Sequence, residues 1–373
     1  MRILLVRLRS IGDVVFTTPL LGALRRHFAG AHLTYLVEPA AAPVLEGNPQ
    51  IDDLMIVPRT RGVARVRDDL RIARRLAKGR FDIAIDLHGG PRSAWFTWAS
   101  GAPVRVGYTI VGRSWMYTHV VARYPQLLPR HSVMNQWDVL TPLGIRHGDP
   151  ATDPVRMVVD PQVEGRVAER LAQAGVRPEH RLIVIHVSAG NPFRRWPEAA
   201  FVSLVVGLAQ RDPARRIVLN SGPSDLDAAR RIGDEARRRL GPQSAALVDL
   251  GPFGLRELLA LSTRAAAFVG GDSGPLHVAA TTPVAIVELL GPTLAERSYP
   301  WRDPGWFTET IDAGPLPCRP CHQRTCVPGD FRCLTSIGPE RVLAAAERAL
   351  QHASSGGLGP DHANERRMPL AQA

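Results

Sequence analysis

Apolar and polar positions alternate along the first part of the chain in two periods, one typical of strands and one typical of helices. Helical spacing covers residues 17–28 and, in an arginine-rich amphipathic segment, residues 66–77. Short apolar runs between them predict buried strands at residues 2–6, 32–37, 54–57 and 81–87. Strands that alternate with helices predict a parallel sheet covered by helices.

The same alternation restarts after a polar, proline-bearing stretch at residues 146–154. Predicted helices follow at residues 163–174, 198–210 and 255–262, and predicted strands at residues 182–186, 216–220, 265–269 and 284–289. We therefore expect an α/β protein with two Rossmann-like domains that face each other across a cleft. The predicted domains are residues 1–150 and 155–350. Residues 354–373, rich in Gly, Pro and polar residues, are expected to form a flexible tail.

Length and composition agree with two globular domains. A chain of 373 residues, 45% apolar and 22% charged, exceeds one core of usual size. Arg7, Arg9 and Asp13 interrupt the apolar start of the chain, and no later segment reaches the roughly 18 apolar residues of a membrane span. These features predict a cytoplasmic protein.

The formal charge of +11 comes almost entirely from arginine, since Lys78 is the only lysine. Arginine suits phosphate and carboxylate ligands, so the charge favours an anionic partner such as a phosphorylated sugar or an anionic lipid surface. For most surface positions, a general replacement of lysine by arginine is the better explanation. No nucleic-acid motif is present, and aromatic residues that could stack on bases are few.

Residues 270–277 (GGDSGPLH) leave a predicted strand and enter a helix. Free amides at Ser273 and Gly274 and the dipole of that helix favour a bound phosphate. His277 is placed to contact the same phosphate or to hold Asp272. The alternative is an ordinary N-cap at Asp272 or Ser273 with His277 in the core.

A second candidate segment follows the predicted strand that ends at residue 186. Ser188 and Gly190 lie at the carboxyl end of this strand, where open α/β sheets bind ligands, and Arg194 is within reach of a diphosphate. Trp196, two residues further on, is expected to pack in the core.

Asp13 follows the first strand and is expected to face the cleft at the carboxyl edge of the first sheet. A carboxylate in this place can take a proton from an attacking hydroxyl group. The alternative is an N-cap for a helix that begins near Val14. The turn offers only Gly12, so it lacks the Gly-x-Gly-x-x-Gly spacing of dinucleotide sites, and a Walker phosphate loop is also missing. NAD-dependent oxidoreductases and P-loop kinases are therefore disfavoured.

All four cysteines fall within sixteen residues, which favours a bound metal over a disulfide framework. Four thiolates would close the coordination sphere of a zinc ion, so its role would be structural. The alternative is a loop of unligated thiols, and the two interpretations are about equal. The four positions are Cys318, Cys321, Cys326 and Cys333.

Taken together, these segments resemble the heptosyltransferases of glycosyltransferase family 9, which build the inner core of bacterial lipopolysaccharide. The matching pieces are residues 10–13 (SIGD) with Thr18 and Pro19, residues 195–197 (RWP) and residues 271–277 (GDSGPLH). A cysteine-bearing loop like residues 318–321 occurs in many members.

The resemblance implies a glycosyltransferase B-type fold and an inverting transfer that needs no metal for catalysis. It implies that Asp13 is the catalytic base and that Asp272, Ser273, Gly274 and His277 bind the donor diphosphate. Arg194 stands where the family often has lysine, and this keeps the charge. Ser224 or Asp225 replaces a glutamate that some members place against the adenosine ribose.

The implied donor is ADP-heptose, and the implied acceptor is an anionic glycolipid. Arg59 and Arg61 belong to a basic segment that meets the anionic sugar in the resembling family, and the same positive face would hold the enzyme at the inner face of the inner membrane. Two alternatives are a nucleotide-sugar epimerase of the same fold and a non-catalytic polyanion-binding module.

Overall fold

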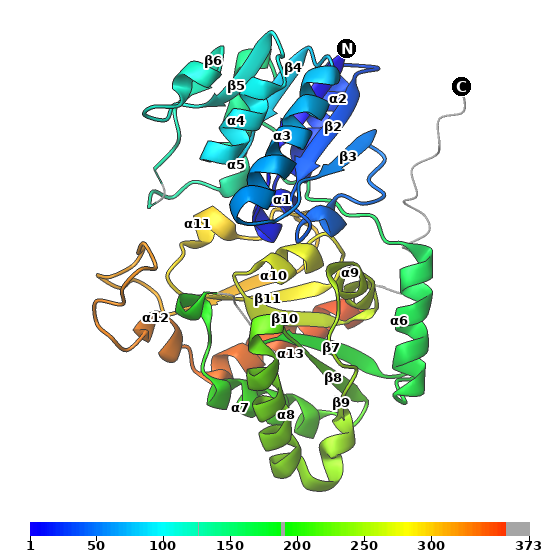
Figure 1. Cartoon of the computed structure of the whole chain (residues 1–373). Coiled ribbons are helices and arrows are strands. Elements are labelled where there is room, and N and C mark those ends of the chain that lie inside the picture. The colour runs from blue at the N-terminus through cyan, green and yellow to red at the C-terminus, as the bar shows by residue number, and fades with distance from the viewer. Residues whose placement is uncertain (126, 188–190, 356–373) are drawn as a thin grey trace.

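A computed structural model describes residues 1–125, 127–187 and 191–355 of the chain. Its first half is a sheet of six parallel strands in the order β3-β2-β1-β4-β5-β6, drawn in blue and cyan in Figure 1. The strands are β1 (Arg2–Val6), β2 (His32–Val37), β3 (Asp53–Ile56), β4 (Ile83–Asp86), β5 (Val104–Tyr108) and β6 (His119–Val121).

The second half repeats this plan with a sheet in the order β12-β11-β10-β7-β8-β9, again parallel throughout. The strands are β7 (Arg181–His186), β8 (Arg215–Asn220), β9 (Leu247–Val248), β10 (Ala267–Gly271), β11 (Ala285–Leu290) and β12 (Thr308–Asp312). Counted along the chain, both sheets have the same doubly wound order. The direction of winding reverses between β1 and β4 and between β7 and β10, and ligands bind at such points in open α/β sheets.

Helices cover both faces of each sheet. In the first half these are α1 (Ile11–Val15), α2 (Thr18–His27), α3 (Gly62–Lys78), α4 (Pro91–Ala99) and α5 (Ser132–Trp137). In the remainder they are α6 (Pro161–Gln173), α7 (Glu198–Arg211), α8 (Leu226–Leu240), α9 (Leu255–Arg264), α10 (Gly274–Ala279), α11 (Ala295–Ser298), α12 (Arg332–Thr335) and α13 (Pro339–Ser355). Because the central strands are covered on both faces, they are continuous apolar runs, and residues 3–6 of β1 are fully buried.

The predicted α/β fold with two Rossmann-like halves is confirmed. The predicted strands overlap with observed ones, although the strand expected at residues 265–269 is β10 and ends two residues later. Four strands carried too weak a pattern to be predicted, namely β5, β6, β9 and β12. The domain limits 1–150 and 155–350 stay predictions. Residues 356–373 of the expected tail lie outside the described residues.

Candidate active site

A cavity of about 680 Å³ lies between the two sheets. Its walls come from both halves, and they follow the carboxyl ends of the central strands, where winding reverses. The first half contributes Ser10, Ile11, Gly12, Asp13 and Phe16, and the second half contributes, among others, Arg194, Ser224, Asp225, Asp272, Ser273, Gly274, His277, Arg297 and Gln323. The candidate base and most of the candidate donor-binding residues therefore share one cavity.

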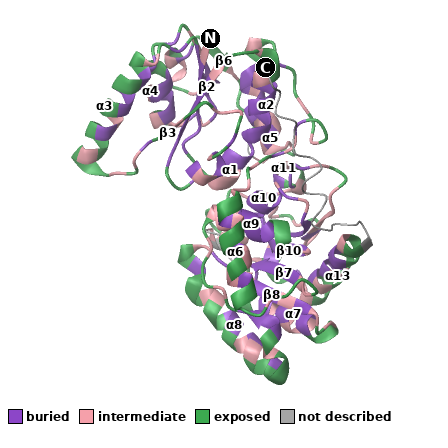
Figure 2. Ribbon diagram, turned by 90° about the vertical axis from the view of Figure 1, so that its right-hand side faces the viewer, coloured by how far each residue is buried: buried purple, intermediate pink, exposed green. Residues whose placement is uncertain are grey.

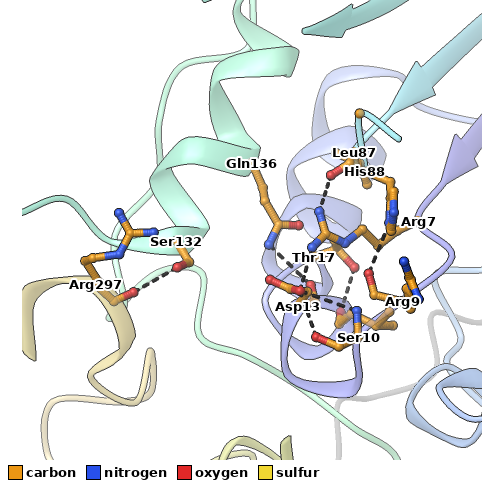
Figure 3. A network of polar contacts seen from close by, with 12 residues as sticks. Arg7, Arg9, Ser10, Asp13, Thr17, Leu87, His88, Ser132, Gln136 and Arg297 are labelled. Carbon is orange, nitrogen blue, oxygen red and sulfur yellow. Dashed lines mark hydrogen bonds and ion pairs between the residues drawn. The ribbon is translucent and has the colours of Figure 1, made fainter. Parts of the chain in front are cut away.

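The carboxylate of Asp13 is held by three donors on one oxygen. Its Oδ2 atom accepts hydrogen bonds from Ser10 Oγ at 2.8 Å and from the Ser10 backbone N–H at 3.3 Å, and it pairs with Arg7 Nη2 at 2.7 Å (Figure 3). The alternative of an N-cap near Val14 is wrong, because the helix begins at Ile11 with Ser10 as its N-cap. Asp13 is the third residue of α1, and its side chain remains 39% exposed.

Arg7 is a site residue that the sequence did not reveal. Its side chain is only 8% exposed, and it donates to the carbonyl oxygen of Leu87 as well as to Asp13. Burial on its own would raise the pKa of Asp13, but the charge of Arg7 and the hydrogen bonds from Ser10 outweigh burial and lower it. Asp13 is therefore ionised at neutral pH, in the state that can accept a proton.

On the opposite wall, Arg194 and His277 both contact Asp272. Arg194 Nη1 lies 3.0 Å from Asp272 Oδ2 and donates to the Asp272 carbonyl oxygen at 3.1 Å, and His277 Nε2 lies 3.4 Å from Oδ1. Burial would raise the pKa of Asp272, but the hydrogen bond to His277 and the charge of Arg194 lower it. Of the roles considered for His277, the structure shows the side chain that holds Asp272, and His277 is also buried with Ser273 as the N-cap of α10, as in the alternative of an N-cap with a core histidine. Gln323 Oε1 accepts from Arg194 Nε at 2.9 Å and fixes the guanidinium further.

The two halves touch through a pair of glycines at the base of the cavity. A Cβ atom on Gly12 would lie 2.9 Å from His277 Cδ2 and 3.5 Å from the Cα atom of Gly274. A Cβ atom on Gly274 would lie 2.8 Å from Ile11 Cβ. The ring centroids of Phe16 and His277 are 4.4 Å apart beside this contact. Only glycine lets α1 and α10 approach this closely, so the glycines set the spacing between Asp13 and residues 272–274, the segment that the resemblance assigns to the donor and that we call the donor loop.

Ser224 and Asp225 line the same cavity at the end of β8. Ser224 Oγ donates to Asp225 Oδ2 at 2.6 Å, and Arg195 Nη2 pairs with Asp225 Oδ1 at 2.9 Å. Trp196 is buried and donates from Nε1 to the carbonyl oxygen of Ile337, so its expected core role is confirmed.

Of the remaining predicted site residues, one pair does not line the cavity and another pair lies outside the described residues. Arg59 and Arg61 are exposed beyond β3 and are not among the residues that line the cavity. Ser188 and Gly190 lie outside the described residues.

Arg297 is a second site residue that the sequence did not reveal. It lies in α11, on the wall of the cavity, and burial lowers its pKa although the charges of Asp272 and Asp13 act in the opposite direction. Its carbonyl oxygen accepts a hydrogen bond from Ser132 Oγ at 3.0 Å, which ties α11 to α5 across the two halves (Figure 3). No sequence signal distinguishes Arg297 from the many surface arginines.

The four cysteines all carry free thiols, and Cys321 reaches the rim of the cavity. Burial raises the pKa of the Cys333 thiol, and the other three cysteines, Cys318, Cys321 and Cys326, raise it further, so they lie near one another. Within the described ranges, no group of three or more His, Cys, Asp and Glu side chains is arranged to hold a metal ion.

Solved structures share this architecture. A glycosyl transferase family 9 protein from Veillonella parvula superposes with a TM-score of 0.79 and 24% identity, over 94% of this chain and 97% of that one. An Escherichia coli heptosyltransferase bound to ADP-2-deoxy-2-fluoro heptose superposes with a TM-score of 0.67 and 20% identity, over 93% and 99%. The fold is therefore the glycosyltransferase B-type fold.

Sequence comparison then gives the family. Residues 70–330 match glycosyltransferase family 9 (heptosyltransferase). Lipopolysaccharide heptosyltransferase 3 of Escherichia coli is 26% identical over 94% of this chain and 99% of its own length. The chain belongs to glycosyltransferase family 9, so the prediction of a glycosyltransferase is confirmed. Along the parts of the chain that the structure describes, none of the helices has both the length and the apolar character needed to cross a membrane.

Proposed function

We propose that this chain transfers a heptose from ADP-heptose to a saccharide of the lipopolysaccharide inner core, with inversion at the anomeric carbon. One observation carries the proposal: the Asp13 carboxylate and the Arg194–Asp272–His277 cluster line the same cavity from opposite halves. The name of the E. coli relative and the ADP-sugar in the E. coli heptosyltransferase structure support this donor and acceptor.

In the proposed reaction, Asp13 accepts the proton of an acceptor hydroxyl group as that oxygen attacks the anomeric carbon of the heptose. The bond between the anomeric carbon and the diphosphate oxygen breaks, and ADP leaves with the bonding electrons. Arg194 and the backbone amides of Ser273 and Gly274 stabilise the negative charge that grows on the leaving phosphate. Because this charge is larger in the transition state than in the bound donor, these groups lower the barrier to transfer.

The adenosine end of the donor is assigned to Ser224 and Asp225, which line the cavity beyond Arg194. Ser188 and Gly190 complete the predicted donor site. Arg59 and Arg61 are assigned to the anionic acceptor, since both are exposed guanidinium groups at the carboxyl edge of the first sheet. The reaction is placed in the cytoplasm, at the inner face of the inner membrane.

Catalysis in this scheme uses no metal ion. A structural zinc ion at Cys318, Cys321, Cys326 and Cys333 stays a prediction that rests on the chemistry of the thiolate donor set, because these side chains are not arranged around a metal position in this structure. A bound zinc ion would stabilise the loop that carries Gln323 beside Arg194.

The decisive variant is Asp13→Asn. Transfer should fall by about 10² to 10⁴ fold, the usual effect of losing a general base, while ADP affinity stays within a few fold because the base faces the acceptor. Heptose transfer and calorimetric ADP binding measure the two effects. Ser10→Ala is the matched control, because it removes a hydrogen bond to Asp13 but keeps the carboxylate. Turnover of Asp13→Asn above about a tenth of wild type is incompatible with a general base at this position.

A further inference from the structure

The first two turns of α3 have their apolar side chains on the solvent side. Val63 is 86% exposed, Val66 is 60% exposed and Leu70 is 42% exposed. Their spacing of three and four residues places them on one side of the helix. In Figure 2 this helix lies at the outer edge of the first half, with much of its surface green. Helices of globular proteins ordinarily turn such a stripe toward the core.

The inward side of these turns is polar instead. Asp68 accepts hydrogen bonds from Thr60 Oγ1 at 3.0 Å and from Arg71 Nη1 at 3.1 Å. Asp69 pairs with Arg92, whose Nε lies 3.0 Å from Asp69 Oδ1 and whose Nη1 contacts Glu38 at 3.1 Å. Ion pairs and hydrogen bonds therefore anchor the start of α3, and apolar packing begins only at Ile72. Packing of the fold does not account for the outward apolar side chains.

Arginines border the apolar stripe. α3 carries six basic and two acidic residues, and Arg67 and Arg74 are exposed on the same side as Leu70. No ion pair involves either arginine within the described part of the chain. We call Val63, Val66, Arg67, Leu70 and Arg74 the α3 face. An apolar stripe bordered by arginines is typical of helices that lie in the interface of an anionic membrane.

Exposed tryptophans occur on the elements that follow α3 along the chain. Trp98 of α4 is 45% exposed, and Trp115 of η2 (Ser114–Met116) is 63% exposed, with ring centroids 5.9 Å apart. α4 packs against α3 (Figure 1), and η2 packs against α4. Tryptophan favours the headgroup level of a bilayer, so the neighbouring surface suits the same environment as the α3 face.

We propose that the α3 face docks this protein onto a membrane surface of anionic phospholipids. The valines and Leu70 enter the boundary between headgroups and acyl chains, and the arginines contact lipid phosphates. The biological reason for this docking rests on the proposed function, because the lipid-linked acceptor of that reaction lies in the membrane. Arg59 and Arg61 immediately precede α3, so docking would bring the acceptor to the edge of the cleft.

Flotation of the full chain with vesicles tests the proposal without any sugar substrate. Wild type should float with vesicles of phosphatidylethanolamine and phosphatidylglycerol and stay unbound with phosphatidylcholine alone. Replacing Val63, Val66 and Leu70 together by glutamine should weaken partitioning about ten- to a hundredfold. Arg67→Gln with Arg74→Gln should weaken it about thirtyfold. The matched control is Val327→Gln, which removes an 88% exposed valine elsewhere and should change nothing.

Equal flotation of wild type and the triple variant would overturn the proposal. A wild type that does not float with anionic vesicles would also overturn it. So would an α3 face that binds a second copy of the chain, which sedimentation velocity would detect as a dimer that is lost in the triple variant. Transfer to a delipidated, water-soluble acceptor separates this result from the proposed function. The triple variant should keep that activity, whereas a wild type that floats but transfers no heptose would contradict the proposed function alone.

Discussion

Replacing Gly274 by alanine adds one methyl group where α10 meets α1. The backbone of Gly274 does not have a positive φ, so it accepts alanine without strain. The new Cβ atom would lie 2.8 Å from Ile11 Cβ and 2.9 Å from Ile11 Cγ2. Carbon atoms in contact are normally about 3.5 to 4.0 Å apart, so the two helices must separate by roughly 0.7 to 1.2 Å. The branched Ile11 side chain is attached at the point of overlap and cannot swing away.

This separation moves Asp13 away from the donor loop. A misplacement of about 1 Å between reacting groups can cost about 10² in rate, and we expect a loss of that order in the rate of transfer. Overpacking should also lower the free energy of unfolding by about 1 to 3 kcal/mol. ADP affinity should change by only a few fold, because the added methyl group points to Ile11 and away from Arg194 and Asp272.

Single-turnover transfer, calorimetric ADP binding and thermal unfolding measure the three quantities. The matched control is Gly165→Ala in the middle of α6, where a Cβ atom meets nothing within 4 Å. Alanine should leave transfer unchanged there and stabilise the helix by up to about 1 kcal/mol. Gly12→Ala should resemble Gly274→Ala, and the double variant should lose less than the sum of both, because both methyl groups open the same contact.

If Gly274→Ala transferred heptose at the wild-type rate with an unchanged melting temperature, the close contact of α1 and α10 would not belong to the reacting state. The glycines would then be incidental to the spacing between Asp13 and the donor loop.

Arg194→Ala should weaken ADP binding about tenfold or more, the effect of losing charged hydrogen bonds, and leave adenosine binding nearly unchanged; equal losses in calorimetry would assign Arg194 to the fold. Arg7→Met removes the cation that lowers the pKa of Asp13, so burial dominates and that pKa rises. Since the base acts as a carboxylate, transfer falls as pH drops through its pKa, and the acid limb of kcat moves to higher pH. Arg7→Lys should keep the acid limb of kcat at low pH. An acid limb that does not move in Arg7→Met would contradict the effect of the Arg7–Asp13 ion pair.

The central strands were predictable because both of their faces are buried, which produces continuous apolar runs such as residues 3–6. β9 has two residues and β6 has three, mostly exposed, so neither forms a run that the sequence can reveal. The candidate site could be predicted from the positions of its residues relative to the strands. Asp272 comes directly after β10 and Asp13 lies at the start of the helix that follows β1, and parallel strands bring such residues to one edge.

Arg7 and Arg297 could not be predicted in the same way. The chain has one lysine and many arginines, so residue type carries little information about any single position. Arg7 matters because it is buried against Asp13 and against Leu87, and Leu87 is eighty residues from Arg7 in the sequence. Arg297 matters because α11 meets α5 across the two halves. The roles of both arginines depend on tertiary contacts, which local sequence patterns do not reveal.

The charges of the cavity explain why these two arginines belong to the site. Arg7 pairs with Asp13, and Arg194 pairs with Asp272, so in each half a carboxylate after a central strand is neutralised by one arginine. Both carboxylates are thereby kept ionised, which suits a base on one wall and a fixed anchor on the other. Arg297 forms no ion pair within the described part of the chain, although the charges of Asp272 and Asp13 raise its pKa against the effect of burial, and it adds a further cation to the cavity wall. In the proposed reaction the leaving diphosphate gains negative charge as the bond to the sugar breaks, and a cation on the cavity wall interacts with that charge more strongly in the transition state than in the bound donor.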